Sequence, residues 1–443
     1  MPARRAGVAL CAAVSAALLS ASAVSAQSQR PAGNQVNSSA PPPAPGAAVT
    51  DTPAPAPERR ALMNLLDRVN LAQPLEESRV RVFGYVEGSA TYNPDPTDAG
   101  TFGDINLDRL FDFDTNQLLL NQINVTAERP VALSRSEWDV GFRTEVIYGS
   151  DARWLHANGM NFYGSGITQN IGAPLQFDPE NQFDLFQAYV DLGVPVGEGL
   201  RLRLGKFASF FGGTVDPNLN TFYSRSLFFA DVRPLTFTGA LATYSPNERL
   251  TFDAGFSRGW DQALEDNNSA LDALGRVTYL FSDRTSLAFA AVTGPEQAGD
   301  SGNYRTLLEL TLKHQASERL RFTLDGTYLQ EAHFHGPPDV RNAKVYDLTA
   351  YANYLLSSQY TLNGRVEVMQ DDDGIATGIV GTTYEATVGV AITPFPGDAT
   401  WKYLKIRPEV RLDYSPQERF GSDLADPDSR TQFTFAVDAI FNF

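Results

Sequence analysis

Residues 319–328 of this chain read RLRFTLDGTY. Successive side chains of an extended strand point to opposite faces, so one face of this segment carries Arg, Arg, Thr, Asp and Thr, and the other carries Leu, Phe, Leu, Gly and Tyr. The same alternation recurs over residues 138–148 and 404–414. Strands with one charged face and one apolar face predict a sheet that meets water on one side and a nonpolar phase on the other.

The length of the strands indicates what that nonpolar phase is. The alternating segments run about 10 to 13 residues, which is twice the length of a usual soluble strand and enough for a tilted crossing of a bilayer. We expect about sixteen such strands, an even number as in bacterial single-chain barrels. They start near residues 79, 117, 138, 183, 199, 235, 249, 271, 284, 303, 318, 344, 359, 382, 402 and 431.

The connections distinguish a barrel from a soluble β-sandwich, which the alternation alone would also fit. Short connections fall at 195–198, 246–248, 282–283, 316–317 and 357–358. Long, polar connections alternate with them and cover about 93–116, 150–182, 209–234, 259–270, 331–343, 371–381 and 415–430. Outer-membrane barrels have short periplasmic turns and long outer loops, and their backbone polar groups must all pair within a closed sheet. We therefore predict an all-β fold, a transmembrane antiparallel β-barrel over residues 79–443 in the bacterial outer membrane.

The composition agrees with a two-faced barrel. The 443 residues include 28 Phe and 17 Tyr, yet the mean hydropathy is −0.23 and the formal net charge is −17. A helical membrane protein needs several long apolar segments, and this sequence has one, at about residues 6–26, so that class is excluded. The acidic excess also argues against binding of nucleic acid, which requires a basic surface.

The first 26 residues have the pattern of an export signal. Arg4 and Arg5 precede an apolar segment over 6–19, and small residues lead to a predicted cleavage site between Ala26 and Gln27. A membrane anchor would need a longer apolar run. Loss of this segment would remove two positive charges and change the formal charge from −17 to −19.

The lone cysteine, Cys11, lies within the predicted signal. Lipid attachment there is disfavoured, because Leu10 stands where a small residue is needed and the position is too early in the segment. The mature chain would therefore have no disulfide, and its stability would depend on hydrogen bonding and packing.

Two further segments precede the predicted barrel. Residues 27–57 are rich in Pro and Ala, which favours an extended or disordered spacer. Residues 58–78 are predicted to form a short amphipathic helix and a connector, with the helix over 58–70. This helix would form a plug or a periplasmic contact, or it would simply seal one end of the barrel. Its apolar face would consist of Leu62, Leu65, Leu66 and Val69.

The alternation also assigns charged side chains to the wall of the lumen, which about sixteen strands would make wide enough for an aqueous channel. The predicted inward positive residues are Arg81, Arg143, Arg201, Arg203, Arg276, Arg305, Lys313, Arg319, Arg321, Arg365, Lys405, Arg407 and Arg411. The predicted inward negative residues are Glu87, Glu128, Asp139, Glu145, Asp191, Asp253, Asp272, Glu309, Asp325, Asp347, Glu367, Glu385, Glu409, Asp413 and Asp438. The two sets nearly balance, so the wall is predicted to be of mixed charge.

Two stretches resemble known outer-membrane proteins. The last strand, 433–443, alternates up to Phe443, and this ending is similar to the C-terminal signature of Gram-negative outer-membrane barrels, which implies recognition by the barrel-assembly machinery. Residues 205–239 resemble the OmpL-like putative β-barrel porin family. The stretches that carry this resemblance are Gly205-Lys206-Phe207, Phe211-Gly212-Gly213, Asn218, Asn220, Tyr223-Ser224-Arg225-Ser226 and Thr238-Gly239.

The resemblance implies that the third long loop folds into the lumen, as in general trimeric porins. The partners expected for the protein are outer-membrane lipid and lipopolysaccharide, small hydrophilic solutes and two further copies in a homotrimer. The charged residues predicted to face a constriction are Lys206, Asp216, Arg225, Asp231 and Arg233, unless they pair with one another and merely hold the loop.

An enzyme is not expected. The four histidines, His156, His314, His333 and His335, have no Ser or acidic partner at a recognisable spacing. The pair His333 and His335 is too small for a metal site. The acidic run 371–373 could attract Ca²⁺ or Mg²⁺, but a solvated loop is the favoured interpretation because Ca²⁺ needs 6–8 oxygen ligands. We therefore predict no cofactor.

The predicted function is passive diffusion of small hydrophilic solutes and ions through a water-filled porin. Because the wall charges balance, most of the net charge is assigned to loops and mouths, and the pore is expected to be unselective or weakly cation-preferring. The alternative is a structural or adhesive barrel with a plugged lumen.

Overall fold

The computed structural model describes residues 61–100, 103–160, 179–335, 340–424 and 426–443. The predicted signal peptide, its cleavage site between Ala26 and Gln27, and the spacer 27–57 lie outside these residues.

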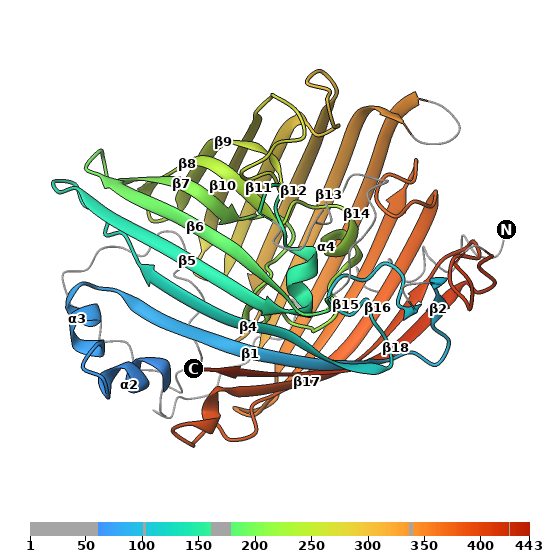
Figure 1. The fold of residues 1–443 in the computed structure, drawn as a ribbon, viewed down its shortest axis with the longest axis horizontal. Helices are drawn as coiled ribbons and strands as arrows, with labels where there is room; N and C mark the ends of the chain where they lie inside the picture. Colours follow the sequence, from blue (N-terminus) through green and yellow to red (C-terminus); the bar gives the residue numbers. More distant parts are fainter. Residues whose placement is uncertain (1–60, 101–102, 161–178, 336–339, 425) are drawn as a thin grey trace, which may run out of the picture. The chain divides into compact units, whose positions relative to one another are not determined.

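Sixteen strands form one closed antiparallel barrel, as the alternation and strand lengths predict (Figure 1). Each strand pairs with its neighbours along the chain, and β1 pairs with β18. The strands are β1 Arg81–Tyr92, β4 Gln117–Arg129, β5 Asp139–Gly149, β6 Gln182–Val194, β7 Leu200–Ala208, β8 Thr236–Asn247, β9 Leu250–Trp260, β10 Asp272–Ser282, β11 Thr285–Pro295, β12 Tyr304–Gln315, β13 Leu320–His335, β14 Val340–Leu355, β15 Tyr360–Asp371, β16 Gly381–Ile392, β17 Leu404–Tyr414 and β18 Thr431–Asn442.

The remaining elements are short. β2 and β3 form a two-stranded ribbon in the first long connection. The bounds of these elements are β2 Thr97–Asp98, β3 Asp104–Ile105, α2 Ala61–Asp67, α3 Ala72–Glu77, α4 Leu227–Asp231 and the 3-10 helices η3 Ser150–Trp154, η4 Pro217–Leu219 and η5 Trp401–Tyr403. Among the helices of the described ranges, none has the length and apolar character needed to span a membrane.

The C-terminal residue takes part in the seam between β1 and β18. The amide of Gly84 donates to the carbonyl oxygen of Phe443 at 3.0 Å, and the amide of Phe443 donates to the carbonyl oxygen of Gly84 at 2.9 Å. A Cβ on Gly84 would lie 2.0 Å from the carbonyl oxygen of Asn124 and 2.8 Å from the Phe443 ring. Glycine at this position therefore lets the last residue close the barrel.

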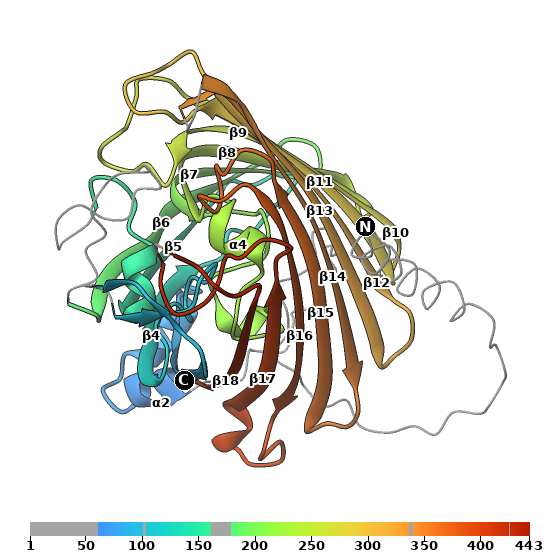
Figure 2. The ribbon, with the colours of Figure 1, turned by 90° about the vertical axis from the view of Figure 1, so that its right-hand side faces the viewer.

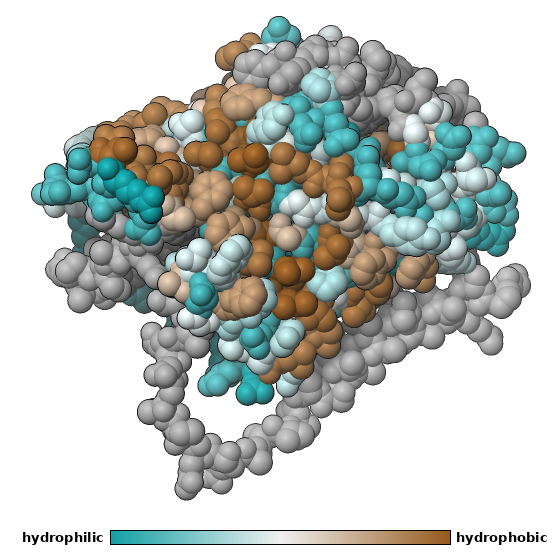
Figure 3. Space-filling view, turned by 60° about the horizontal axis from the view of Figure 1, so that its bottom comes forward, coloured by the Kyte–Doolittle hydropathy of each residue, from teal (hydrophilic) through white to brown (hydrophobic). Residues whose placement is uncertain are grey.

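Along each strand, residues that face the lumen alternate with exposed residues on the outside, which matches the predicted period of 2. Figure 3 shows apolar residues across the middle of one outer face and hydrophilic residues toward its ends. The exposed outward side chains include Phe252, Phe256, Val277, Phe289, Leu310, Leu348, Val388, Phe433 and Phe435. This arrangement gives the barrel an apolar outer surface.

The two ends of the barrel differ as expected. The connections at the end that also holds the chain terminus are mostly short, and we call this the turn end; it includes 195–199, 248–249, 283–284, 316–319 and 356–359. The opposite end, the loop end, carries the longer connections such as 93–116, 209–235 and 415–430.

One predicted loop, 331–343, is mostly strand. β13 extends to His335 and β14 begins at Val340, so His333 and His335 belong to β13. The register shifts between Glu331 and Phe334, and this bulge lets the pairing continue past the point where the simple alternation ends.

The predicted N-terminal helix differs from the observed one. α2 ends at Asp67, and the chain turns at Asn70 with φ of 58° before α3 begins. Met63 is the buried side chain of α2, whereas Leu65 and Val69 of the predicted apolar face are 56% and 61% exposed. The short helix contacts β1 and α3. Of the predicted apolar face, Leu62 and Leu66 are partly buried, Leu65 is exposed within α2, and Val69 lies beyond the end of the helix.

Candidate functional site in the barrel lumen

The connection between β7 and β8, residues 209–235, lies inside the barrel, and we call it the inner loop. Its helix α4 appears within the ring of strands in both Figure 1 and Figure 2. Wall side chains of β12, β15 and β17 bind its backbone, as the following contacts show. This placement agrees with the resemblance that implied a third loop folded into the lumen.

Three wall carboxylates accept hydrogen bonds from backbone amides of the inner loop. They come from three different strands and all lie at inward positions of the alternation. The bonds are Gly212 N to Glu309 (2.6 Å), Leu227 N and Phe228 N to Glu367 (2.8 and 2.9 Å), and Tyr223 N and Ser224 N to Glu409 (2.8 and 2.9 Å). Hydrogen bonds to a charged acceptor contribute about 1.5–3 kcal/mol each.

Three wall arginines bind the carbonyl oxygens of the same loop. Each also forms an ion pair with a carboxylate of the wall, which fixes its guanidinium in place. The bonds are Arg365 to Ser224 O (2.8 Å), Arg407 to Pro217 O and Asn220 O (2.9 and 2.8 Å), and Arg411 to Arg225 O; the paired carboxylates are Glu385, Asp438 and Asp413. Together with the carboxylates, these side chains hold the loop through its peptide groups.

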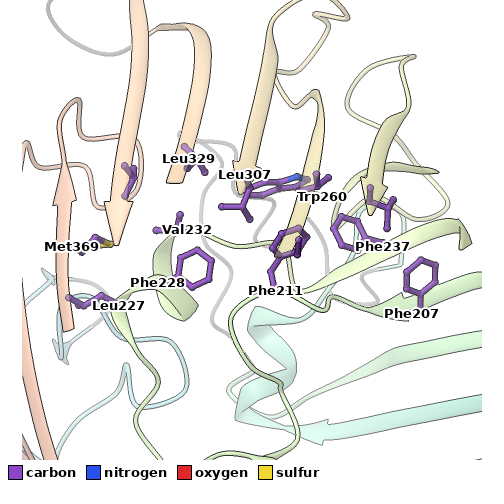
Figure 4. Close-up of a cluster of buried hydrophobic side chains, with 14 of the residues drawn as sticks. Phe207, Phe211, Leu227, Phe228, Val232, Phe237, Trp260, Leu307, Leu329 and Met369 are labelled. Carbon is purple, nitrogen blue, oxygen red and sulfur yellow. The ribbon is translucent and has the colours of Figure 1, made fainter. Parts of the chain in front are cut away.

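Apolar contacts attach the inner loop to another part of the wall (Figure 4). Phe211, Leu227, Phe228 and Val232 of the loop belong to a buried cluster with inward side chains of β10 to β15. We call these wall residues the apolar belt; they are Leu274, Val292, Leu307, Leu329, Val345 and Met369. Each belt residue is no more than 5% exposed.

The residues predicted to face the lumen were all charged, so the prediction did not include the apolar belt. The signal was present: Leu307 lies between Arg305 and Glu309 at the inward spacing, and Met369 follows Glu367 at the same spacing. An inward apolar residue among charged ones therefore indicates a segment packed inside the lumen.

A second buried cluster lies on the other side of the inner loop. Tyr223 and Phe229 pack there with Phe111 of the first long connection, and the rings of Phe111 and Phe229 are 5.8 Å apart. The Tyr223 hydroxyl donates to the Phe111 carbonyl at 2.8 Å. Arg109 holds this connection to the wall through Asp413 at 2.5 Å. Two long connections thus pack together in the lumen.

The structure separates the residues predicted at a constriction. Lys206 lies in β7 rather than in the loop, where its Nζ donates to the Leu185 carbonyl at 2.8 Å. Asp216 caps η4 by accepting from the Asn218 amide at 2.9 Å. Asp216, Arg225, Asp231 and Arg233 lie in the inner loop, as predicted, so Lys206 is the one member of the set outside it.

Arg225 and Arg233 are buried within the inner loop. Arg225 donates to the Val215 carbonyl at 3.1 Å and lies over the ring of Phe229, while Arg233 donates to the Gly213 carbonyl at 3.1 Å. Burial lowers the pKa of Arg225 and lowers that of Arg233 to about 9. Both remain cations at neutral pH and serve mainly to fold the loop onto itself.

The two loop carboxylates have the opposite shift. Burial raises the pKa of Asp216, and it raises the pKa of Asp231 well above its usual range. The nearby negative charge of Asp108 adds to the shift of Asp231, and the positive charge of Arg419 opposes it.

The predicted wall residues on strands lie at inward positions, and most form ion pairs. Arg319 differs because it precedes β13 and lies in the short connection 316–319. The pairs are Arg143 with Glu128 and Glu145, Arg203 with Asp191, and Arg305 with Glu331. Four inward cations on strands, Arg201, Lys313, Arg321 and Lys405, form no ion pair with any described residue, and the Nζ of Lys405 instead donates to the Asn218 carbonyl oxygen of the inner loop at 3.4 Å.

Candidate catalytic and metal residues take part in local structure. His156 is buried, with its Nε2 2.8 Å from Gln182 Oε1. The Asp371 carboxylate accepts backbone amides of its own connection, including those of Gly374 and Ala376 at 2.7 and 3.0 Å. Within the described ranges, no group of three or more His, Cys, Asp or Glu residues is arranged to hold a metal ion.

The raised pKa of Asp231 leads to a pH prediction. As the pH falls through that pKa, Asp231 takes up a proton and the lumen loses a negative charge. The chloride share of the current should therefore rise on acidification, and Asp231→Asn should lack this step. Reversal potentials in a KCl gradient at several pH values measure this change in the chloride share.

Asp398→Asn is the control, because backbone hydrogen bonds from Trp401 and Thr400 lower the pKa of this exposed carboxyl. An unchanged pH profile in Asp231→Asn would contradict the prediction.

The sequence of this chain matches the model of a known protein family. Residues 79–443 match the model of the family described as "Putative beta-barrel porin-2, OmpL-like". The search of curated proteins found no match.

Solved structures of similar fold include three outer-membrane proteins. The outer membrane channel DcaP of Acinetobacter baumannii has a TM-score of 0.53 at 11% identity, over 82% of this chain and 97% of that one. OprB of Pseudomonas putida has a TM-score of 0.53 at 9% identity, over 85% and 97%. The trimer form of OmpT of Vibrio cholerae has a TM-score of 0.51 at 10% identity, over 82% and 99%. At these identities the likeness concerns the fold.

Proposed function

The chain belongs to the OmpL-like putative β-barrel porin-2 family, and from this premise we propose that it carries small hydrophilic solutes by passive diffusion across the outer membrane. It is an outer-membrane channel, and its family and its structural neighbours are channels. The path would run through the lumen beside the inner loop.

One observation carries this proposal. Several inward side chains at and near the turn end stay in contact with solvent, although the mid-barrel wall is covered by the inner loop. Lys313 and Arg321 are exposed, and the side chain of Arg276 is 30% exposed. Charged side chains that point into a closed barrel and remain solvated support a water-filled passage there.

Liposome swelling tests the proposal directly. Vesicles that contain the folded protein should swell in sugars at rates that fall with sugar size, from a pentose to a tetrasaccharide. Heat-unfolded protein is the control. Absence of swelling with a pentose, for protein that is demonstrably folded, would overturn the proposal.

The plugged barrel remains the competing function, and a specific observation favours it. The inner loop packs against apolar clusters on both of its sides, which would narrow the lumen. If the wild-type protein gives no swelling and a variant with a released inner loop does, the resting lumen is closed.

We also propose the assembly that the family resemblance implies. The trimer form of the OmpT neighbour supports a homotrimer, and the C-terminal Phe443 supports recognition by the barrel-assembly machinery. Outer-membrane lipid and lipopolysaccharide would surround the apolar outer face. Crosslinking of the protein in native membranes tests the homotrimer, and the absence of a trimer band would contradict it.

A further inference from the structure

The inner wall does not present its positive and negative charges equally to the lumen. Twelve of the fifteen predicted inward carboxylates are buried, compared with three of the thirteen predicted inward cations. The buried carboxylates are Glu87, Glu145, Asp191, Asp253, Asp272, Glu309, Asp347, Glu367, Glu385, Glu409, Asp413 and Asp438; the buried cations are Arg365, Arg407 and Arg411. The sequence supplies similar numbers of inward positive and negative residues, but the fold buries most of the negative ones and leaves most of the positive ones in contact with solvent.

The carboxylates are buried because they hold other parts of the protein. Glu309, Glu367 and Glu409 bind backbone amides of the inner loop. Others neutralise wall arginines, as Asp438 does for Arg407. An ion-paired carboxylate such as Asp438 adds little net charge to the lumen, and the buried carboxylates that bind the inner loop offer a passing cation no direct contact.

The cations that stay accessible lie near the turn end. Arg201 is on β7, Lys313 on β12 and Arg321 on β13, and we call these three residues the basic arc. Arg201 donates to Thr243 Oγ1 at 2.9 Å, and Arg321 donates to Gln315 Oε1 at 3.1 Å. Both partners are neutral, and the nearby carboxylates, Asp191 and Asp253 for Arg201 and Asp325 for Lys313, compensate the charges of the arc only in part because none forms an ion pair with it.

The accessible wall around the basic arc adds few negative charges. Arg203 and Arg276 are paired with Asp191 and Asp253 at 2.9 Å each, and these pairs are neutral overall. Asp325 on β13 is the one further inward carboxylate near the arc among the described residues. Cations therefore outnumber anions on this part of the lumen.

We propose that the basic arc makes the lumen favour small anions, such as chloride and small carboxylates, over cations. This inference rests on the proposed diffusion function and reverses the sign expected from the sequence, which assigned selectivity to the acidic mouths. Most carboxylates of the connections lie at the loop end, for example in 93–116 and 415–430, whereas the arc lies on the inner wall near the turn end and faces the passage there.

Charge magnitudes set the expected size of the effect. Three unit charges about 10 Å from a permeating ion in water, with a Debye length of about 10 Å at 0.1 M salt, favour chloride over potassium by roughly fourfold. At 1 M salt the Debye length is about 3 Å, so the preference should fall toward one.

Reversal potentials of single channels in a KCl gradient test the proposal. The wild-type channel should prefer chloride about fourfold at low salt, and the triple variant Arg201→Gln, Lys313→Gln and Arg321→Gln should lose that preference. The matched control is Arg135→Gln, Arg249→Gln and Arg284→Gln, which removes the same formal charge from exposed connections at the turn end. It should keep most of the preference.

The outcomes are distinct. A wild-type channel that prefers potassium or neither ion overturns the basic arc, and so does a triple variant that keeps the chloride preference while the control loses it. The side chain of Lys313 forms no hydrogen bond or ion pair with described residues, so the single variant Lys313→Gln repeats the test if the triple variant does not fold. Folded protein without any conductance would instead refute the diffusion function.

Discussion

Replacing both Glu367 and Glu409 with Gln should release the inner loop from the wall. Each glutamate accepts hydrogen bonds from two backbone amides, one at each carboxylate oxygen. A glutamine side chain has one oxygen and one NH₂ group, so its NH₂ group would face one of the two N–H donors and could not accept that bond. With one charge-assisted bond lost at each position, docking should weaken by about 3–6 kcal/mol. Hydrogen exchange of the amides of residues 223–228 should accelerate by about 10²–10⁴, and single-channel conductance should rise.

A matched control for this variant is Glu331→Gln. Glu331 is also a buried wall glutamate, but its ion-pair partner is Arg305 of the neighbouring strand rather than the inner loop. It should leave the exchange of the inner loop unchanged. If the double variant keeps wild-type protection and conductance, the carboxylates do not anchor the loop.

Replacing Phe228 with Ala should detach the other side of the inner loop. Phe228 is 2% exposed and packs with the apolar belt, and its ring covers Gly212, where a Cβ would lie 2.4 Å from it. Truncation of a buried Phe to Ala costs about 3–5 kcal/mol. Exchange should accelerate at residues 227 and 228, because the truncated ring leaves Glu367 as their remaining wall anchor, and it should change little at 223 and 224, which Glu409 binds and which pack in the other cluster.

This pattern differs from that of the double glutamine variant, which should lose protection at both pairs. Leu219→Ala is the control, since Leu219 belongs to the same loop and is 49% exposed. Equal loss of protection at all four amides in Phe228→Ala would show that the inner loop detaches as one unit and that its contacts are not separable.

The wall of this barrel could be predicted from the sequence because it follows a local rule. A period of 2 assigns each side chain to one face, so residues such as Arg143 and Phe252 have their places without any three-dimensional information. Strand length and the sorting of connections then fixed a closed membrane barrel with sixteen strands.

The lumen could be predicted less well because its contacts are long-range. The bond between Glu409 and Tyr223 joins residues 186 positions apart and involves the peptide group of Tyr223, so no residue type signals it. The exposure of Lys313 and the burial of Glu309, four residues away on the same strand, likewise depend on where the inner loop lies. The end of α2 at Asp67 and the extension of β13 through a bulge depend on backbone geometry that the periodicity does not encode.

The way in which the wall holds the inner loop has a consequence for evolution and design. The three carboxylates and three arginines bind peptide groups, which every residue supplies, so substitutions at exposed loop positions such as Leu219 should leave the anchors intact. Attachment and permeation are therefore encoded in different residues. A library of variants confined to those exposed positions could change which solutes pass while the protein still inserts and folds, and natural drift could explore the same space one mutation at a time.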